Sequence, residues 1–178
     1  ISTPAAITSA LAAATRRGAL IKGGAALEQL GTVTTVALDK TGTLTEGKPQ
    51  VTDIVALNNH SDADVLTYAS AVESGSHHPL AKAILERTEA EGLTITEAEN
   101  RKAHAGKGVD GELNGVTILV SAPGKLADGL LTDAAAADVT RLENEGKTVV
   151  AVVADNQLTG LIAMQDTLRS DAVEAIAQ

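Results

Sequence analysis

Several residue types are missing from this 178-residue chain. It has no cysteine, no phenylalanine and no tryptophan, and Tyr68 is its single aromatic residue. Without cysteine, the chain can form neither a disulfide scaffold nor a cysteine-based zinc module. With only one aromatic side chain, it has no stacking platform for the bases of a nucleic acid. Its core must therefore be built from alanine, valine, leucine and isoleucine, which supply most of a hydrophobic fraction of 44%.

Positive charge is also scarce. The chain has 14 Lys and Arg against 23 Asp and Glu, for a net charge of -9. This balance argues against a nucleic-acid partner, which would require a basic face. The charge is uneven, because residues 1–50 hold five basic and three acidic side chains whereas residues 51–178 hold nine and twenty.

The first 15 residues carry no charge and are followed by Arg16 and Arg17. Fifteen residues are too few to cross a bilayer, which takes about 20. We expect them to be the cytoplasmic end of a membrane helix that begins upstream of Ile1, so that the chain is an internal fragment and the arginine pair marks the membrane exit. An alanine-rich soluble helix is the alternative. A signal peptide is disfavoured, because no Met or charged segment precedes the apolar run.

Apolar spacing predicts buried strands over residues 33–38 and 51–57. Two helices should follow the second strand. The first begins after Ser61, which can form a capping box with Asp64. The second begins at Pro79, a residue suited to the first helical position.

The second half of the chain predicts hairpins. Residues 109–113 and 116–120 flank Asn114-Gly115, the strongest short hairpin signal. After a helix capped by Thr132 or Asp133, residues 148–153 and 158–164 form another hairpin across residues 155–157. The pattern over residues 51–164 therefore predicts one α+β domain with an antiparallel sheet. The predicted strand over residues 33–38, which precedes this domain, has no parallel partner within the chain.

Asp39 follows the first predicted strand and opens the run Asp39-Lys40-Thr41-Gly42-Thr43-Leu44-Thr45. A carboxylate at the end of a strand can attack a phosphoryl group, while Thr41 and Thr43 contact the phosphate and Mg²⁺ neutralises its charge. The seven residues resemble the phosphorylation loop of P-type ATPases. The resemblance implies Asp39 as the phosphorylated nucleophile, Lys40, Thr41 and Thr43 as its catalytic partners, and Mg²⁺ at Asp39 and Thr41.

The residue two positions after Asp39 separates two reaction classes. Haloacid-dehalogenase-like phosphatases usually carry a second Asp there, which speeds hydrolysis of the acyl phosphate. This chain has Thr41, which leaves the phosphoenzyme long-lived, as an ion pump requires. A soluble phosphatase of that type is therefore the disfavoured alternative.

The run Glu73-Ser74-Gly75-Ser76-His77-His78-Pro79-Leu80 lies between the two predicted helices. It resembles the Ser-x-His-Pro-Leu motif in the nucleotide-binding domain of heavy-metal P-type ATPases. The resemblance implies that Glu73, Ser76 and His78 bind ATP, and His78 is the best available ring to stack on adenine. The alternative is a helix cap with an exposed histidine pair. A metal site at His77 and His78 is disfavoured, because adjacent side chains diverge.

Gly106-Lys107-Gly108-Val109-Asp110-Gly111 fits the Gly-x-Gly-x-x-Gly pattern of dinucleotide-binding folds, but a hairpin follows it where such a fold needs a helix. The run instead resembles the Gly-x-Gly of the ATP pocket, which implies that Gly106 and Gly108 let the backbone approach the nucleotide. Lys107 can meet a phosphate or remain solvated. The family usually has Val-Gly-Asn or Val-Gly-Ser after the second hairpin strand, and here Ser121 is expected to substitute.

The resemblance covers the whole chain and implies its organisation. The expected fold is α/β: an incomplete haloacid-dehalogenase-like, Rossmann-like phosphorylation domain with an inserted α+β nucleotide-binding domain. We expect residues 1–30 to be the end of a membrane helix and the stalk, and residues 31–50 to be the first part of the phosphorylation domain. Residues 51–164 are expected to form the nucleotide-binding domain. Residues 165–178 then return to the phosphorylation domain, with Asp166 and Arg169 as hinge residues.

The implied function is the ATP-binding and phosphorylation region of a heavy-metal exporter in the cell membrane, with this region cytoplasmic and ATP and Mg²⁺ as cofactors. The transported cation would be bound by transmembrane parts outside this chain. Residues 1–4 and 11–18 resemble zinc/cadmium/lead exporters more than copper exporters. Because the later motifs of the phosphorylation domain are absent, we expect the chain alone to bind ATP without turnover. A non-catalytic nucleotide-binding module is the remaining alternative.

Overall fold

The computed structural model of the chain describes residues 2–177, with side chains for residues 4–40 and 42–177. These residues form two compact units, Ile1–Leu38 and Asp39–Gln178. The first unit holds the alanine-rich helix α1 (Ser2–Arg16) and the short helix α2 (Gly24–Leu30). The two helices touch where Gly24 leaves room for Ile7. No helix within residues 2–177 is both long and apolar enough to cross a membrane.

The predicted strand over residues 33–38 is wrong. This segment follows α2 as irregular chain and pairs with no strand among the residues described. Val33, Val36 and Leu38 are each at least half exposed. A strand needs a neighbour to satisfy its backbone hydrogen-bonding groups. The apolar pattern alone could not supply that neighbour.

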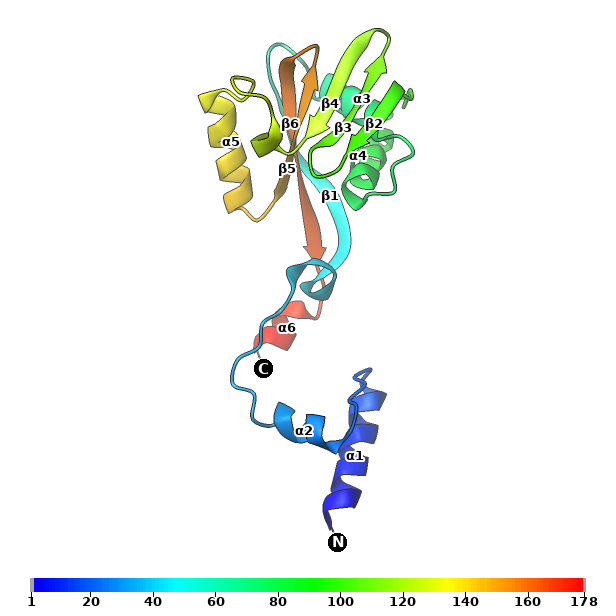
Figure 1. The fold of residues 1–178 in the computed structure, drawn as a ribbon, viewed down its shortest axis with the longest axis vertical. Helices are drawn as coiled ribbons and strands as arrows, with labels where there is room; N and C mark the ends of the chain where they lie inside the picture. Colours follow the sequence, from blue (N-terminus) through cyan, green and yellow to red (C-terminus); the bar gives the residue numbers. More distant parts are fainter. Residues whose placement is uncertain (1, 178) are drawn as a thin grey trace. The chain divides into compact units, whose positions relative to one another are not determined.

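The second unit is built on a six-stranded antiparallel sheet with the strand order β1-β6-β5-β4-β3-β2 (Figure 1). The strands are β1 (Thr45–Ala56), β2 (Glu99–His104), β3 (Gly108–Leu113), β4 (Val116–Ser121), β5 (Thr148–Ala154) and β6 (Gln157–Leu168). Both predicted hairpins form. Asn114 and Gly115 take the left-handed backbone that a tight turn requires, with φ of 52° and 82°. The second turn is one residue shorter than predicted, because Gln157 already belongs to β6.

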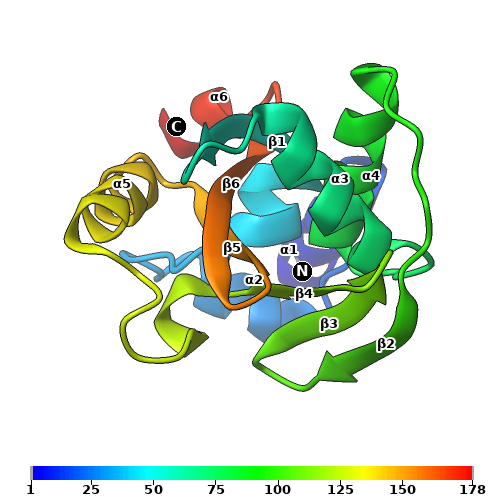
Figure 2. The same ribbon diagram turned by 90° about the horizontal axis from the view of Figure 1, so that it is seen from above.

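Helices cover both faces of the sheet. Those on its faces are α3 (Asp62–Glu73), α4 (Pro79–Ala90) and α5 (Asp133–Asn144), whereas α6 (Ala172–Ala177) follows the end of β6; the short turns are η1 (Lys40–Leu44) and η2 (Pro123–Lys125). Figure 2 shows α3 and α4 on one side of the strands and α5 on the other. The predicted capping box of Ser61 and Asp64 forms at α3, and Thr132, one of the two predicted candidates, caps α5.

The core consists of two aliphatic layers, one on each face of the sheet. Leu66, Ile84 and Ile118 belong to the layer beneath α3 and α4, and Leu142 and Leu161 to the layer beneath α5. These side chains are almost completely buried. The structure thus fills its interior without Phe or Trp, as the composition requires.

Strands β1 and β6 continue beyond the rest of the sheet and form a two-stranded neck (Figure 1). Thr45 pairs with Leu168 and Pro49 with Asp166, with an irregularity in β1 between these two pairs. In chain order, η1 directly precedes β1 and α6 follows β6, so both are attached to the sheet through the neck. The neck therefore joins the loop after Asp39 to the α+β body.

Candidate functional site

One cleft in the second unit brings together every residue that the sequence predicted to bind ATP. Its volume is about 420 Å³, and it is bounded by the α3–α4 loop, the β2–β3 turn and strands β4 and β5. The predicted residues that line it are Glu73, Ser76, His78, Gly106, Lys107, Gly108 and Ser121. They come from three segments far apart in the sequence.

His78 is held at the amino terminus of α4. Its Nδ1 accepts a hydrogen bond from the Leu80 backbone amide at 3.2 Å, and its own backbone amide donates to Ser76 Oγ at 3.3 Å. Because Nδ1 accepts, it carries no proton, and the proton of the neutral ring lies on Nε2. His78 thus caps the helix with one nitrogen while the exposed ring lines the cleft.

Glu73 is the last residue of α3 and is half-buried on the cleft wall. Burial raises the pKa of Glu73 above its usual range, although the nearby His78 and a hydrogen bond with Ser76 act in the opposite direction. Partly desolvated carboxyl groups in clefts are characteristic of binding and catalytic sites.

The two glycines of the β2–β3 turn have different reasons to lack a side chain. Gly106 has φ of +69°, and a Cβ added there would meet no atom within 4 Å. Gly108 has φ of +127°, and a Cβ would lie 2.1 Å from the Val120 carbonyl oxygen. Gly106 therefore leaves open space, whereas Gly108 is also required by the packing of β3 against the end of β4.

Ser121 connects that turn to β4. Its buried hydroxyl donates a hydrogen bond to the Lys107 carbonyl and also lies 3.2 Å from the Ala122 carbonyl. The hydroxyl proton is thus used within the protein, and a ligand could meet only the oxygen. The Lys107 side chain is exposed.

The sequence did not single out all of the residues that line the cleft. The additional ones are mostly aliphatic: Leu80, Ile84, Ala103, Val109, Val120, Ala122, Val149 and Val150, together with Thr148 and His104. His104 ends β2, and its Nε2 lies 3.0 Å from Asp110 Oδ1. The only sequence feature that could have pointed to His104 is its position two residues before Gly106. The burial pattern of β2 offers no other, because every residue of this strand is exposed, so that buried and exposed positions do not alternate.

The predicted phosphorylation loop forms η1, directly after Asp39. Gly42 has φ of +76°, and its amide donates to Thr45 Oγ1 at 3.1 Å. Asp39 and Thr43 are exposed, while the side chain of Thr41 lies outside the described residues. Lys40 Nζ reaches the Gly146 carbonyl at 3.5 Å, which links the loop to the turn before β5.

A second cavity of about 320 Å³ adjoins the first. Lys40 and Asp166 line it, and it shares His78, Leu80 and Thr148 with the cleft. The predicted nucleotide residues and one predicted catalytic residue are therefore connected along one continuous concave surface.

Asp166 fastens the neck, where the sequence predicted a hinge. Its carboxylate accepts hydrogen bonds from the Thr45 hydroxyl at 2.5 Å and from the amides of Gly47 and Lys48 at 3.1 and 2.8 Å. Burial raises the pKa of Asp166, but these hydrogen bonds and the charge of Lys40 outweigh it, so the pKa lies below its usual range. The side chain of Arg169, the other predicted hinge residue, is exposed, and its amide donates to the Leu44 carbonyl.

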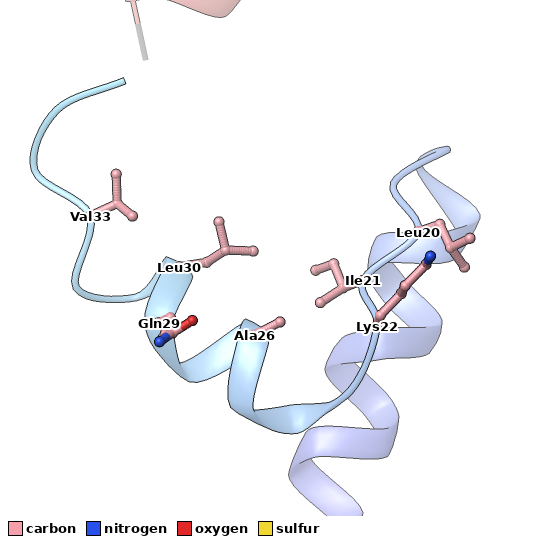
Figure 3. A pocket seen from close by; sticks show the side chains of 7 residues that line it. All are labelled: Leu20, Ile21, Lys22, Ala26, Gln29, Leu30 and Val33. Carbon is pink, nitrogen blue, oxygen red and sulfur yellow. The ribbon is translucent and has the colours of Figure 1, made fainter. Parts of the chain in front are cut away.

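The first unit has a hollow of its own, shown in Figure 3. It is open, about 430 Å³ in volume, and lined by Leu20, Ile21, Lys22, Ala26, Gln29, Leu30 and Val33. None of the predicted site residues belongs to it.

Residues 33–178 match the haloacid dehalogenase-like hydrolase family, and the chain belongs to that family. It is 54% identical over all 178 residues to a zinc/cadmium/lead-transporting P-type ATPase of Shigella sonnei (strain Ss046) and 41% identical over 174 residues to copper-exporting P-type ATPase B of Archaeoglobus fulgidus. These alignments cover 100% and 97% of the chain but only 24% of either relative.

A crystal structure of a zinc-transporting PIB-type ATPase in the E2.Pi state also matches, with a TM-score of 0.74 and 54% identity. The match covers 99% of this chain and 29% of that one. The predicted fold class and the predicted resemblance to heavy-metal P-type ATPases are therefore confirmed, and the chain spans about a quarter of the length of these relatives.

Proposed function

We propose that this chain is the ATP-binding and phosphorylation region of a P-type ATPase that exports a heavy-metal cation. The observation that carries the proposal is the single cleft in which all seven predicted nucleotide residues meet. We further propose the boundaries set out above, with residues 51–164 as the nucleotide-binding domain and the segments on either side as parts of the membrane stalk and phosphorylation domain.

The cleft suits a nucleotide in size and lining. Its volume of about 420 Å³ falls within the range of ligand pockets, about 300–1,000 Å³. Leu80 and Val150, which are partly exposed, supply an apolar surface for a base, while Glu73 and His78 supply polar groups that can orient it. The open space at Gly106 allows the backbone to approach the ligand.

Asp39 would perform the chemistry. A carboxylate oxygen attacks the γ-phosphorus of ATP, the bond from that phosphorus to the β–γ bridging oxygen breaks, and ADP leaves with the electron pair. Lys40 places a positive charge beside the loop, and Thr43 offers a hydroxyl to the phosphate.

Mg²⁺ usually takes one or two carboxylates together with phosphate oxygens. The exposed carboxylate of Asp39 is a ligand of this kind. Asp39 and Thr41 are the residues proposed to hold it. When bound, Mg²⁺ neutralises charge on the phosphate.

The transported ion is proposed from the relatives. Identity to the zinc/cadmium/lead transporter exceeds identity to the copper exporter, 54% against 41%. We therefore favour zinc, cadmium or lead, with copper second. The ion would be bound by membrane-embedded parts of the whole protein, and the region described here would face the cytoplasm.

Replacing His78 by asparagine tests the cleft. Asparagine is a good helix cap, so His78→Asn keeps α4 intact while it removes the ring. Losing a stacking contact costs about 1–3 kcal/mol, so we expect ATP affinity to fall by about 5- to 150-fold in calorimetry of the 178-residue chain.

His77→Asn is the matched control, because His77 is exposed and does not line the cleft. Its ATP affinity should equal that of the unmodified chain. Unchanged affinity in His78→Asn as well would reduce His78 to a helix cap and contradict its proposed contact with the nucleotide.

A further inference from the structure

His104 lines the cleft but has no role in the proposed function. It is the last residue of β2 and pairs with Gly108 across the turn that contains Gly106. Its side chain is 46% exposed, so a ligand in the cleft can reach it. Its Nε2 lies 3.0 Å from Asp110 Oδ1, which holds the ring in place.

The partner of His104 determines which ring nitrogen carries the proton. An ionised carboxylate has only acceptors, so His104 Nε2 must donate the hydrogen bond to Asp110. In the neutral ring, Nδ1 is then a bare acceptor. Within residues 2–177, Nδ1 of His104 has no hydrogen-bond partner of its own. One of the residues that line the cleft thus has an unused acceptor nitrogen.

Asp110 acts only through this ring. It lies on β3 and does not line the cleft, and 37% of its side chain is exposed. It is therefore a positioning residue, and His104 is the residue that a ligand would touch.

We propose that His104, with its tautomer fixed by Asp110, makes the cleft prefer adenine over guanine nucleotides. This specificity rests on the proposed nucleotide-binding function. Adenine carries an amino donor at the position where guanine carries a carbonyl acceptor. Nδ1 of His104 accepts a hydrogen bond from the amino group of adenine. With guanine, the same nitrogen faces a carbonyl oxygen, and because both atoms are acceptors no hydrogen bond can form.

Calorimetric titration of the 178-residue chain with ATP and with GTP tests this specificity. The unmodified chain should bind ATP more tightly. His104→Leu should weaken ATP binding about three- to tenfold, the worth of one net hydrogen bond, and should not weaken GTP binding, because the substitution also removes the acceptor that faces the guanine carbonyl. Asp110→Asn keeps the shape of the pair, but its amide can donate to Nε2 and move the ring proton to Nδ1. This variant should also lose preference, by gaining affinity for GTP.

His77→Leu is the control histidine outside the cleft and should retain the preference for ATP. The specificity inference is overturned if His104→Leu leaves the ratio of ATP to GTP affinity unchanged, or if both affinities fall in parallel; the pair is then a surface contact between strands. If the unmodified chain binds no nucleotide, the proposed function itself has failed. Thermal unfolding of each variant serves as the folding control, because it shows that each variant is folded under the conditions of the titration.

Discussion

At the scale of single residues, two histidines on one cleft are held by different ring nitrogens. His78 accepts a hydrogen bond at Nδ1 from Leu80, and His104 donates one from Nε2 to Asp110. In each case the partner sets the tautomer, and with it the atom that remains for a ligand. The same side chain therefore presents a donor at His78 and an acceptor at His104.

Gly108 offers a test at the residue scale. Gly108→Ala forces a Cβ to within 2.1 Å of the Val120 carbonyl oxygen and also strains the backbone at a φ of +127°. Overpacking and a left-handed backbone together cost about 3 kcal/mol. We expect urea denaturation to show that loss in the free energy of unfolding.

Gly106→Ala is the matched control in the same turn. A Cβ there meets no atom within 4 Å, so only the positive φ is unfavourable and the expected loss is about 1 kcal/mol. Equal losses in the two variants would show that the contact with Val120 does not determine the need for glycine at position 108.

At the scale of elements, the sequence predicted well wherever a local interaction defines the structure. Ser61 caps α3, Asn114-Gly115 turns the first hairpin and Pro79 opens α4, each within a few residues of its own signal. The same locality explains why Glu73 and His78 could be placed in the cleft: both lie next to recognisable helix ends.

Prediction failed where an element depends on a distant partner. Residues 33–38 are apolar yet form no strand, whereas β1 begins at Thr45 in a stretch that contains Gly47 and Pro49 and is held by pairing with β6. His104 was missed because the exposed strand β2 follows neither a strand period nor an apolar run. Pairing across the sheet, and not local propensity, decides these cases.

The neck formed by β1 and β6 depends on one carboxylate. Asp166→Asn replaces the carboxylate whose oxygens accept hydrogen bonds from Thr45, Gly47 and Lys48 by a neutral amide. This change should lower the free energy of unfolding by about 1–2 kcal/mol. Because the pKa of Asp166 is lowered in the folded chain, its contribution is present above the unfolded pKa and is lost as pH falls through the folded pKa. Urea denaturation at neutral and at acidic pH should show a stability difference that shrinks with acidification.

Asp171→Asn serves as the control, since that carboxylate is 79% exposed and lies 3.9 Å from Arg169. Its removal should change stability little at any pH. A loss for Asp166→Asn that persists undiminished at low pH would contradict the assignment, because it would point to a packing defect and not to the lost charge.

At the scale of the whole molecule, the α+β body has both of its ends at the neck. Thr45 and Leu168 are paired neighbours, and the two core layers lie between them in the sequence. Bodies with adjacent ends and a core of their own commonly fold independently.

We therefore expect residues 45–168 to fold and to bind nucleotide without the remainder of the chain. Thermal unfolding should be cooperative, with a midpoint within a few degrees of that of the 178-residue chain, and calorimetry should give the same ATP affinity. A non-cooperative transition would show that η1 or α6 belongs to the folding unit.

The pairing of β1 with β6 also has a consequence for synthesis on the ribosome. The two strands are separated by on the order of 100 residues, which take about 5–20 s to translate. During that interval β1 has been made but its partner strand has not. Helices α3 and α4, which are made between them and pack against β1, can shield its apolar face in the meantime. The order of elements along the chain thus protects its first strand until its last strand arrives.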